Sequence, residues 1–205
     1  MDDSYLTITR ESKAESKVKG SRFIGETFKV STVAAAMAML EAVRRREFSA
    51  THHCYAWQVG TGDGKQFKYS DDGEPNGTAG KPIYDVIAGR GVTNLLLVVT
   101  RYFGGTKLGT GGLARAYSDA ARTVMELSGS EEKFLTSSYR FTLAISLYDR
   151  WQKQLQLLGG RITDSTFAER VTTDVEIRLS RIEELLKMFS DLTAGRGEVE
   201  RIKEN

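Results

Sequence analysis

Cysteine and proline are scarce in this sequence, which has one cysteine, Cys54, and two prolines among its 205 residues. A single cysteine excludes an internal disulfide, so the folded chain must be stabilised by its core. The strongly apolar run at residues 95–99 is far too short to cross a bilayer. The N-terminal stretch MDDSYLTITR has neither the basic start nor the apolar core of a signal peptide. We therefore expect a cytoplasmic protein without a membrane segment.

Excess charge is also small, because 29 lysines and arginines oppose 27 aspartates and glutamates, for a net charge of +2. A protein that coats nucleic acid with its whole surface needs a strongly basic field, which this balance excludes. Any binding to a polyanion must therefore come from a local patch. The hydrophobic fraction of 40% is enough to build a core, in one domain or in two small ones.

The glycines are unevenly distributed, since 13 of the 20 lie between residues 60 and 112. Both histidines and both prolines fall between residues 52 and 112, so the first half of the chain is rich in loops and chemically unusual. Residues 128–133, SGSEEK, form a polar stretch after which the pattern becomes regular. We predict two domains, residues 1–130 and residues 134–205, joined by this linker.

The second half predicts a simple order of elements. Apolar residues alternate at 141–147 and again at 171–179, which indicates strands with one buried face. Residues 148–158 and 182–192 carry apolar residues at helical spacing. With a last strand after the second helix, the order βαββαβ is typical of a ferredoxin-like sandwich.

The first half predicts an α+β domain. Helices are expected at about residues 33–46, 82–88 and 113–127, the first of them capped by Ser31 or Thr32. The turn at residues 60–65, GTGDGK, joins two of the strands. The expected strands are residues 5–9, 22–30, 52–59, 67–70 and 95–101.

The segment RYFGGTKLGTGGLARAY, residues 101–117, follows a predicted strand and leads into a predicted helix, as many phosphate-binding loops do. A Walker A loop would need a lysine directly after Gly109, where Thr110 stands. Residues 109–114 match G-x-G-x-x-A, but no acidic ribose ligand follows on a second strand. We therefore expect no nucleotide cofactor.

The same segment suits a nucleic-acid backbone better than a nucleotide. Amides at a helix N-terminus, together with Lys107 and Arg101, have the chemistry to hold a phosphodiester. In the competing interpretation, the glycines only permit a tight turn and close packing. The candidate nucleic-acid-binding residues are Lys81, Arg101, Gly104, Gly105, Lys107, Gly109, Gly111, Gly112 and Arg115.

The segment HHCYAW, residues 52–57, raises the alternatives of a metal site and a thiol enzyme. His52 and His53 are adjacent on a predicted strand, so their side chains point to opposite faces and do not easily share one ion. His52 and Cys54 share a face, as a nucleophilic pair would, although Cys54 also suits an ordinary buried strand. We expect no metal, and we assign no catalytic residue.

The segment SDDGEPNGTAGKP, residues 70–82, carries Asp71, Asp72 and Glu74 among turn-forming residues. It lacks the further oxygen ligands of a calcium loop. Two interpretations remain. In one, the acidic and amide side chains bond neighbouring backbone amides in a structured turn. In the other, two of the carboxylates perform general acid–base chemistry.

Four segments together resemble the Impact family, whose bacterial members are called YigZ-like. These are SRFIG at residues 21–25 and the three segments that begin at residues 52, 70 and 101, in this order and spacing. The resemblance covers nearly all of residues 15–127, and the chain from Phe134 is similar to the smaller second domain of the bacterial members.

The resemblance implies a fold and a role. The first half is expected to be like the second domain of a small-subunit ribosomal protein and the fourth domain of elongation factor G. The second half is expected to be like the ferredoxin-like fifth domain of that factor. Eukaryotic members regulate translation by restraining an amino-acid-starvation kinase through its ribosomal activator. This sequence lacks their extra N-terminal domain, so we expect it to share the ribosome link rather than the kinase role.

Three functions are therefore compared. The leading hypothesis is a non-enzymatic, RNA- or ribosome-associated regulator of translation, with a protein partner in translation control as a further expectation. The second is a small hydrolase that uses Asp71, Asp72 or Glu74 with His52 or His53. The third is a protein-interaction module whose partner contacts the aromatic and glycine-rich surface. RNA binding that falls with salt favours the first, and turnover sensitive to mutation favours the second.

Overall fold

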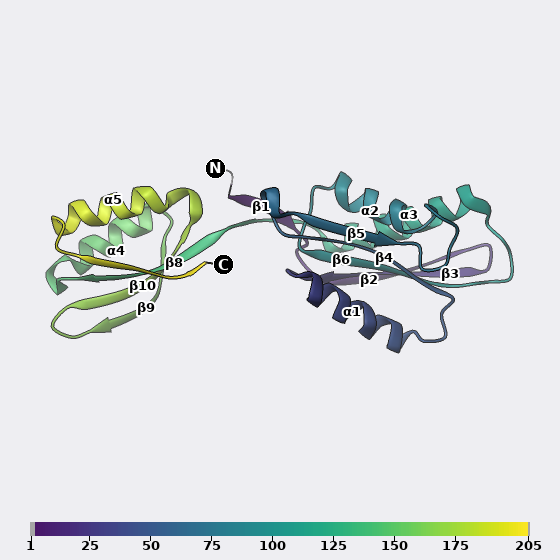
Figure 1. Ribbon diagram of the computed structural model, residues 1–205, viewed down its shortest axis with the longest axis horizontal. Helices are drawn as coiled ribbons and strands as arrows, with labels where there is room; N and C mark the ends of the chain where they lie inside the picture. The colour runs from purple at the N-terminus through teal and green to yellow at the C-terminus, as the bar shows by residue number, and fades with distance from the viewer. Residues whose placement is uncertain (1–2, 205) are drawn as a thin grey trace. The chain divides into compact units, whose positions relative to one another are not determined.

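The computed structural model describes residues 3–204, which divide into two compact units (Figure 1). Residues 5–132 form the N-terminal unit. Residues 133–204, with Asp3 and Ser4, form the C-terminal unit. The boundary falls within strands β1 (Ser4–Thr7) and β7 (Glu131–Phe134), which pair in a two-stranded sheet. Residues 128–133, predicted as a linker, thus end a helix and enter a strand.

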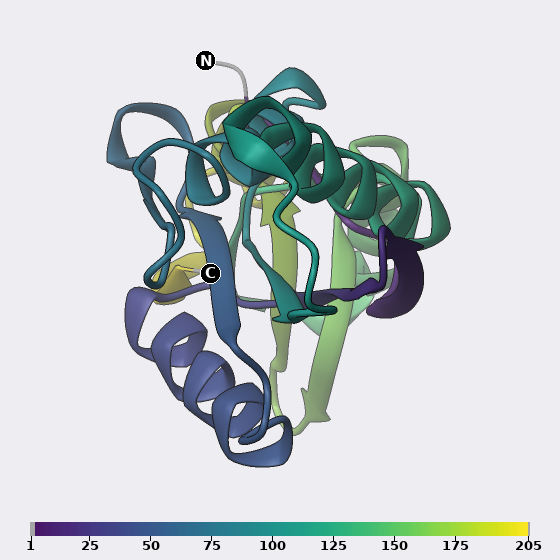
Figure 2. The ribbon, with the colours of Figure 1, turned by 90° about the vertical axis from the view of Figure 1, so that its right-hand side faces the viewer.

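The N-terminal unit is built on an antiparallel five-stranded sheet with helices on both faces. Figures 1 and 2 show α2 (Gly80–Gly89) and α3 (Gly109–Ser128) on one face and α1 (Val33–Arg46) on the other. A 3₁₀ turn, Gly62–Gly64, lies in the predicted turn between the last two strands. In order across the sheet, the strands are β2 (Ser12–Val18), β3 (Ser21–Lys29), β6 (Leu95–Tyr102), β4 (His52–Val59) and β5 (Gln66–Ser70).

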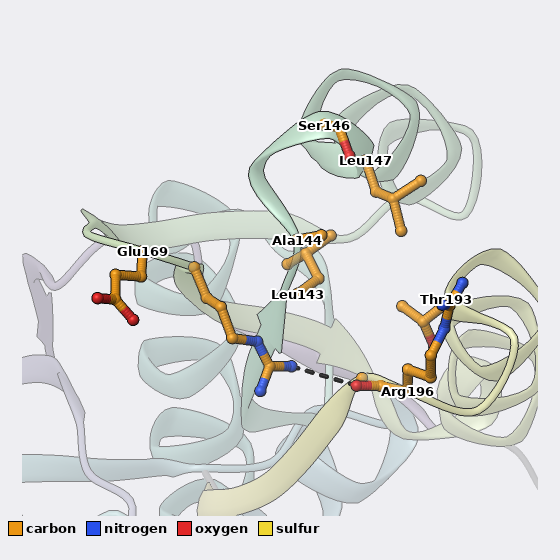
Figure 3. Close-up of a pocket in the computed structure, with 9 residues that line it drawn as sticks. Leu143, Ala144, Ser146, Leu147, Glu169, Thr193 and Arg196 are labelled. Atoms are coloured by element: carbon orange, nitrogen blue, oxygen red, sulfur yellow. Dashed lines mark hydrogen bonds between the residues drawn. The ribbon is translucent and has the colours of Figure 1, made fainter.

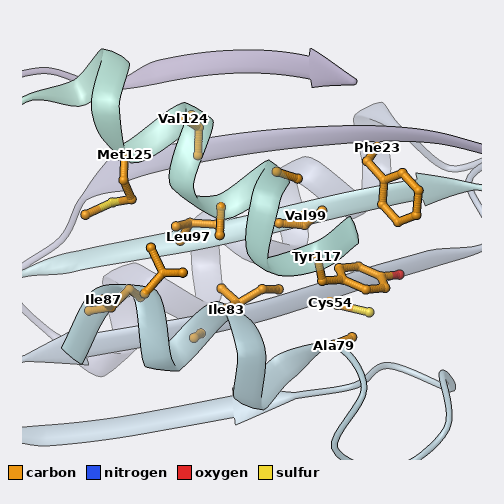
Figure 4. Close-up of a cluster of buried hydrophobic side chains, with 14 of the residues drawn as sticks. Phe23, Cys54, Ala79, Ile83, Ile87, Leu97, Val99, Tyr117, Val124 and Met125 are labelled. Carbon is orange, nitrogen blue, oxygen red and sulfur yellow. The ribbon is translucent and has the colours of Figure 1, made fainter. Parts of the chain in front are cut away.

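The central strand β6 explains why the sheet is covered on both sides. Leu95, Leu97 and Val99 pack into the core beneath α2 and α3, which Figure 4 shows in part, whereas Leu96 and Val98 pack towards α1. All five are fully buried. A strand that is buried on both faces has a continuous apolar sequence, as residues 95–99 do.

Helix α1 has the bounds that its sequence predicts. Thr32 is the N-cap, since its Oγ1 accepts a hydrogen bond from the amide of Ala35 at 3.1 Å. The buried side of the helix is formed by Ala36, Leu40 and Val43. Of the two predicted caps, Ser31 and Thr32, the helix therefore uses Thr32.

Strand β2 is not predicted by the sequence. Its residues, SKAESKV, are polar and lie at the edge of the sheet, so they show no strong apolar alternation. The strand forms because β3 offers it a complete ladder, from Ser12 opposite Thr27 to Val18 opposite Ser21. Gly25 of β3 lies beneath α3, where an added Cβ would stand 3.0 Å from the carbonyl oxygen of Ala120.

The C-terminal unit has the predicted order of elements, βαββαβ. Its four-stranded antiparallel sheet is arranged β11-β8-β10-β9. Phe141, Trp151 and Phe189 form its aromatic core, with ring centroids 4.7–5.0 Å apart. The elements are β8 (Thr136–Leu143), α4 (Tyr148–Leu157), β9 (Arg161–Phe167), β10 (Val171–Arg178), α5 (Ile182–Thr193) and β11 (Glu198–Glu204).

Two strand ends in this unit differ from the prediction. Ile145 and Leu147, expected to continue the first strand, belong to a 3₁₀ turn, Ile145–Leu147, that leads into α4. Leu179 likewise belongs to the 3₁₀ turn Leu179–Arg181 before α5. The period-2 pattern of apolar residues thus runs past the end of the ladder, into turns where Ile145 is 48% exposed and Leu147 and Leu179 are half-buried.

Candidate functional site

The three unusual segments of the N-terminal unit meet at one end of its sheet. Strand β4 lies antiparallel to β6, so that His52 stands opposite Arg101. Residues 71–79 connect β5 to α2 and bring Glu74 to the same place. Helix α3 adds Tyr117, whose ring meets Phe23 edge-on at 5.2 Å. Residues far apart in the sequence thus form one cluster.

A buried ion pair is the centre of this cluster. Nη1 of Arg101 donates to Oε1 of Glu74 at 2.5 Å, and the two side chains are only 5% and 4% exposed. The hydroxyl of Tyr117 donates to the same oxygen at 2.8 Å, and Nη2 of Arg101 donates to Oγ of Ser21 at 3.2 Å. Burial raises the pKa of Tyr117, so its hydroxyl stays protonated as a donor. This network stabilises the buried charges of Arg101 and Glu74, each of which would be strongly destabilising without the other.

Arg101 was predicted as a cation beside a nucleic-acid backbone, and the structure corrects this. Its guanidinium is buried and neutralised by Glu74, so it offers no charge to solvent. The sequence had left pairing with Asp71, Asp72 or Glu74 as the other role of Arg101, and Glu74 is the partner.

The two histidines contact different groups. Nδ1 of His52 lies 2.8 Å from the carbonyl oxygen of Asp72, and its Nε2 lies 3.8 Å from Oε1 of Glu74. Nε2 of His53 instead lies 3.2 Å from the carbonyl oxygen of Glu47. Among the described residues, no three histidine, cysteine or acidic side chains are grouped so that they could hold a metal ion.

The acidic segment is a braced turn. The carboxylate of Asp71 accepts hydrogen bonds from the amides of Gly77, Ala79 and Gly80 at 2.8–2.9 Å, which confirms the structural interpretation for this residue. Asp72 accepts from Arg44 at 2.8 Å and from the amide of His53 at 2.7 Å. The carboxylates of Asp71 and Asp72 are therefore already bound to backbone amides and, for Asp72, to Arg44.

Cys54 lies in the core and not at a surface. It is fully buried, and its Sγ donates to the carbonyl oxygen of Asp71 at 3.0 Å (Figure 4). Burial raises the pKa of its thiol far above the ordinary value. A protonated, inaccessible thiol is a poor nucleophile, so the geometry does not favour a Cys–His pair.

A cavity of about 330 Å³ opens beside the ion pair. It joins the acidic segment to the glycine segment, because Glu74 and Pro75 form one wall and the start of α3 forms another. The other lining residues are Arg101, Phe103, Lys107, Leu108, Gly109, Thr110 and Leu113.

Helix α3 begins at Gly109, four residues before the predicted start. Gly109, Gly111 and Gly112 therefore belong to its first turn and not to a loop, which corrects the prediction. Glycine has a low helix propensity, and only packing of the whole helix against the sheet decides where it starts. The N-cap, Leu108, makes no side-chain capping bond, and the first turn contains no acidic residue. Its amides and the positive end of the helix dipole therefore suit an anion.

Of the predicted cations, Lys107 and Arg115 are exposed, and neither forms an ion pair within residues 3–204. Lys107 lies at the cavity beside the start of α3. Lys81 is on α2, where its Nζ binds Asp85 at 2.7 Å.

The two glycines before Lys107 differ in role. Gly104 packs against the turn between β2 and β3, where an added Cβ would stand 1.9 Å from the carbonyl carbon of Gly20. Its amide also donates to Oγ of Ser21 at 3.2 Å. Gly105 has open space around its Cα and a φ of 84°. Ser21 and Tyr117 were not among the predicted site residues, although both lie inside the segments that carry the resemblance.

A second cavity, of about 440 Å³, lies in the C-terminal unit (Figure 3). Arg170 lines it and donates to the carbonyl oxygens of Thr142 and Arg196 at 3.0 and 3.2 Å. This guanidinium also pairs with Glu198, so it is used to tie the strands together. The lining residues are Leu143, Ala144, Ser146, Leu147, Glu169, Arg170, Thr193, Arg196 and Gly197.

Fold and site together define a two-unit α+β protein whose glycine segment opens a long helix beside a buried ion pair. Residues 19–125 match the family model described as the Impact N-terminal domain. Residues 146–196 match a second model, a domain of unknown function called DUF1949. The chain belongs to the Impact family.

Its relatives cover nearly the whole chain. It is 32% identical over 194 residues to "IMPACT family member YigZ" of Escherichia coli (strain K12), across 94% of this chain and 95% of that protein. It is 30% identical over 196 residues to "IMPACT family member YvyE" of Bacillus subtilis (strain 168), across 96% and 90%. A solved structure titled "Crystal structure of an hypothetical protein" is 32% identical and matches all of both chains with a TM-score of 0.70.

The described helices include none that is long and apolar enough to span a membrane.

Proposed function

We propose that this protein is a non-enzymatic, RNA- or ribosome-associated regulator of translation. The observation that carries the proposal is the uncapped start of α3, which opens into the 330 Å³ cavity beside the exposed Lys107. Backbone amides and the helix dipole hold a phosphate without reading a base, and a nearby lysine adds a point charge.

The number of unpaired cations at the cavity determines how strongly and how specifically we expect RNA to bind. Arg101 is neutralised by Glu74, so Lys107 is the principal cation at the cavity, with Arg115 further along α3. Contacts of this kind position a nucleic-acid backbone and are only weakly sequence-specific. A moderate, salt-sensitive affinity for many RNAs follows.

The hydrolase alternative is less well supported by the geometry. General acid–base chemistry needs two groups free to exchange protons with a substrate. Here Glu74 is engaged by Arg101 and Tyr117, and Nδ1 of His52 lies against the carbonyl oxygen of Asp72. These contacts favour a structural role for the cluster.

The resemblance to two consecutive domains of elongation factor G supports a ribosomal location. The βαββαβ order of the C-terminal unit is compatible with the ferredoxin-like fifth domain of that factor. Translation control by the eukaryotic members also supports a ribosomal location, and this support is an analogy of fold and family. Within this proposal, residues 1–130 and 134–205 act as the two domains.

The test is fluorescence anisotropy with labelled single-stranded and structured RNAs at two salt concentrations. Lys107→Ala should weaken all RNAs alike and lower the logarithmic salt slope by about one unit or less. Lys153→Ala, which removes an exposed lysine from α4, is the matched control and should change little. Absence of binding at low salt, or binding that ignores Lys107, would contradict the proposal.

A further inference from the structure

Phe103 is the one aromatic residue among those that line the 330 Å³ cavity beside the start of α3, and it is 48% exposed. The guanidinium carbon of Arg101 lies over its ring, 5.4 Å from the ring centroid, so the other face of the ring is left to the solvent side. The amide of Phe103 donates to Oγ1 of Thr51 at 3.1 Å, and the next amide, that of Gly104, donates to Oγ of Ser21 at 3.2 Å. The ring is therefore held on a backbone that is already fixed.

The core does not account for this ring. Phe103 directly follows the last residue of β6 and belongs to none of the three clusters of buried apolar side chains. A single exposed phenylalanine is ordinary. This one, however, lines a cavity whose other apolar residues are Pro75, Leu108 and Leu113. A cavity of 330 Å³ is at the small end of ligand pockets, so it suits one small planar group better than a stack of several.

The wall of the cavity also contains an unused hydrogen-bond donor. Nη1 and Nη2 of Arg101 bind Glu74 and Ser21, whereas its Nε is buried and has no hydrogen-bond partner among the described residues. Buried polar groups are nearly always bonded, so a buried donor without a partner at a cavity calls for an acceptor on the occupant. Nucleobases carry carbonyl and ring-nitrogen acceptors on their edges.

The unpaired charge around the cavity is positive. Lys107 lines it, and Gly104 packs against Gly20, which brings the exposed Lys19 of the turn between β2 and β3 to the same loop. Neither lysine forms an ion pair within residues 3–204. Most acids nearby are paired with cations: Glu74 with Arg101, Glu15 with Arg22, Glu47 with Arg46, and Asp72 with Arg44. Asp71 instead accepts from three backbone amides. Two unpaired lysines therefore oppose one such carboxylate.

We propose that the cavity takes one unpaired nucleotide of a single-stranded RNA, with its base on the ring of Phe103 and its phosphate at Lys107 and the first amides of α3. This inference rests on the RNA-binding function proposed above and names the part of the RNA that enters the site. Aromatic side chains bind splayed-out bases by stacking, and every base has a flat face, so the contact tolerates many sequences. A base within a duplex is not available to the ring, so binding should favour single strands.

The carboxyl terminus of a peptide is the competing occupant, because its carboxylate would suit the same amides. A carboxylate brings one negative charge and no planar group to stack. The exposed ring and the two unpaired lysines instead match a chain that carries repeated charges and flat bases, which favours RNA.

The experiment measures fluorescence anisotropy of labelled RNA with the full chain. The probes are a short oligouridylate, a blunt RNA duplex of the same length, and an abasic strand with the same number of phosphates. Phe103→Leu removes the flat ring but keeps apolar bulk, and it should weaken oligouridylate binding roughly 5- to 100-fold. It should change binding of the duplex and the abasic strand little, because these contact only the phosphate site.

Two further variants check the role of the ring. Phe103→Trp should keep or improve the affinity for oligouridylate, since it restores a flat ring. Phe167→Leu, at a phenylalanine of the C-terminal unit that is 57% exposed, is the matched control and should change nothing.

The outcomes separate this inference from the proposed function. If Lys107→Ala weakens oligouridylate binding while Phe103→Leu does not, the inference is refuted and the proposed function stands. If Phe103→Leu weakens all three probes alike, the ring supports the loop and stacks on no base, and the inference is wrong. If the wild type binds no RNA, both are refuted. If a labelled short peptide with a free carboxyl terminus binds through Phe103 and oligouridylate does not bind, the cavity is a peptide site and both are wrong.

Discussion

Arg101 and Glu74, 27 residues apart in the sequence, form an ion pair in which both side chains are almost wholly buried. The pair ties the end of β6 to the turn before α2 and forms one wall of the candidate cavity. Removing one partner would leave the other charge buried without compensation. Its integrity is therefore a condition for every function assigned to this end of the unit.

Glu74→Gln should lower the free energy of unfolding by about 3–5 kcal/mol, because Arg101 loses its counter-charge in a buried site. Urea unfolding followed by circular dichroism measures this. Glu41→Gln is the control, since Glu41 is half exposed in its pair with Arg44 and should cost below about 1 kcal/mol. A cost at Glu74 as small as that at Glu41 would show that the pair does not stabilise the unit.

Asp3 should make the C-terminal unit sensitive to acid. Its carboxylate accepts hydrogen bonds at 2.8 Å from Nη2 of Arg178 and from the amide of Ser180. The Arg178 bond chiefly holds the pKa of Asp3 well below its usual range, against the opposing effect of burial. A depressed pKa means that the stabilisation is complete above the unfolded pKa of about 4 and is lost as the pH falls below it.

Asp3→Asn should accordingly cost about 1–2 kcal/mol at pH 7, a reduced figure because the Arg178 side chain is 40% exposed. The difference between variant and wild type should shrink as the pH falls from 5 to about 3. Thermal unfolding across this range is the measurement. A difference that stays constant with pH would contradict the role of the charge.

Two glycine substitutions should separate the first turn of α3 from the contact before it. Gly111→Ala should stabilise the protein by about 0.5–1 kcal/mol, since the residue is helical with open space around its Cα. Gly104→Ala should destabilise it by several times that amount, because the new Cβ would overlap the backbone of Gly20. Unfolding of both variants in urea gives the comparison. A stability loss at Gly111 would argue against a helix that begins at Gly109.

The thiol of Cys54 should be inert in the folded protein. It is fully buried and its pKa is raised by burial, so the thiolate is both rare and inaccessible. Labelling with a thiol reagent at pH 8 should be at least about 100-fold slower than in denaturant. Rapid native labelling without unfolding would reopen the thiol-enzyme hypothesis.

Local sequence was enough for elements whose residues face one constant environment. Residues 95–99 lie between two cores, so their apolar run predicts a buried strand directly. The helix of residues 33–46 has its own N-cap and apolar side. In the βαββαβ half, apolar residues recur at clear strand and helix periods. In these cases the same residues determine both the local conformation and the face that is buried.

Tertiary structure decided what depends on a distant partner. Edge strand β2 exists because β3 completes its hydrogen bonds, and α3 starts at Gly109 because packing outweighs the low helix propensity of glycine. The local sequence also allowed Arg101 to face solvent, and only the fold places its Nη1 2.5 Å from Oε1 of Glu74. The rings of Phe67 and Tyr84, 17 positions apart (84 − 67), meet only after β5 and α2 have packed. Each of these outcomes depends on a contact between elements, and a pattern within one element carries no information about which partner it will meet.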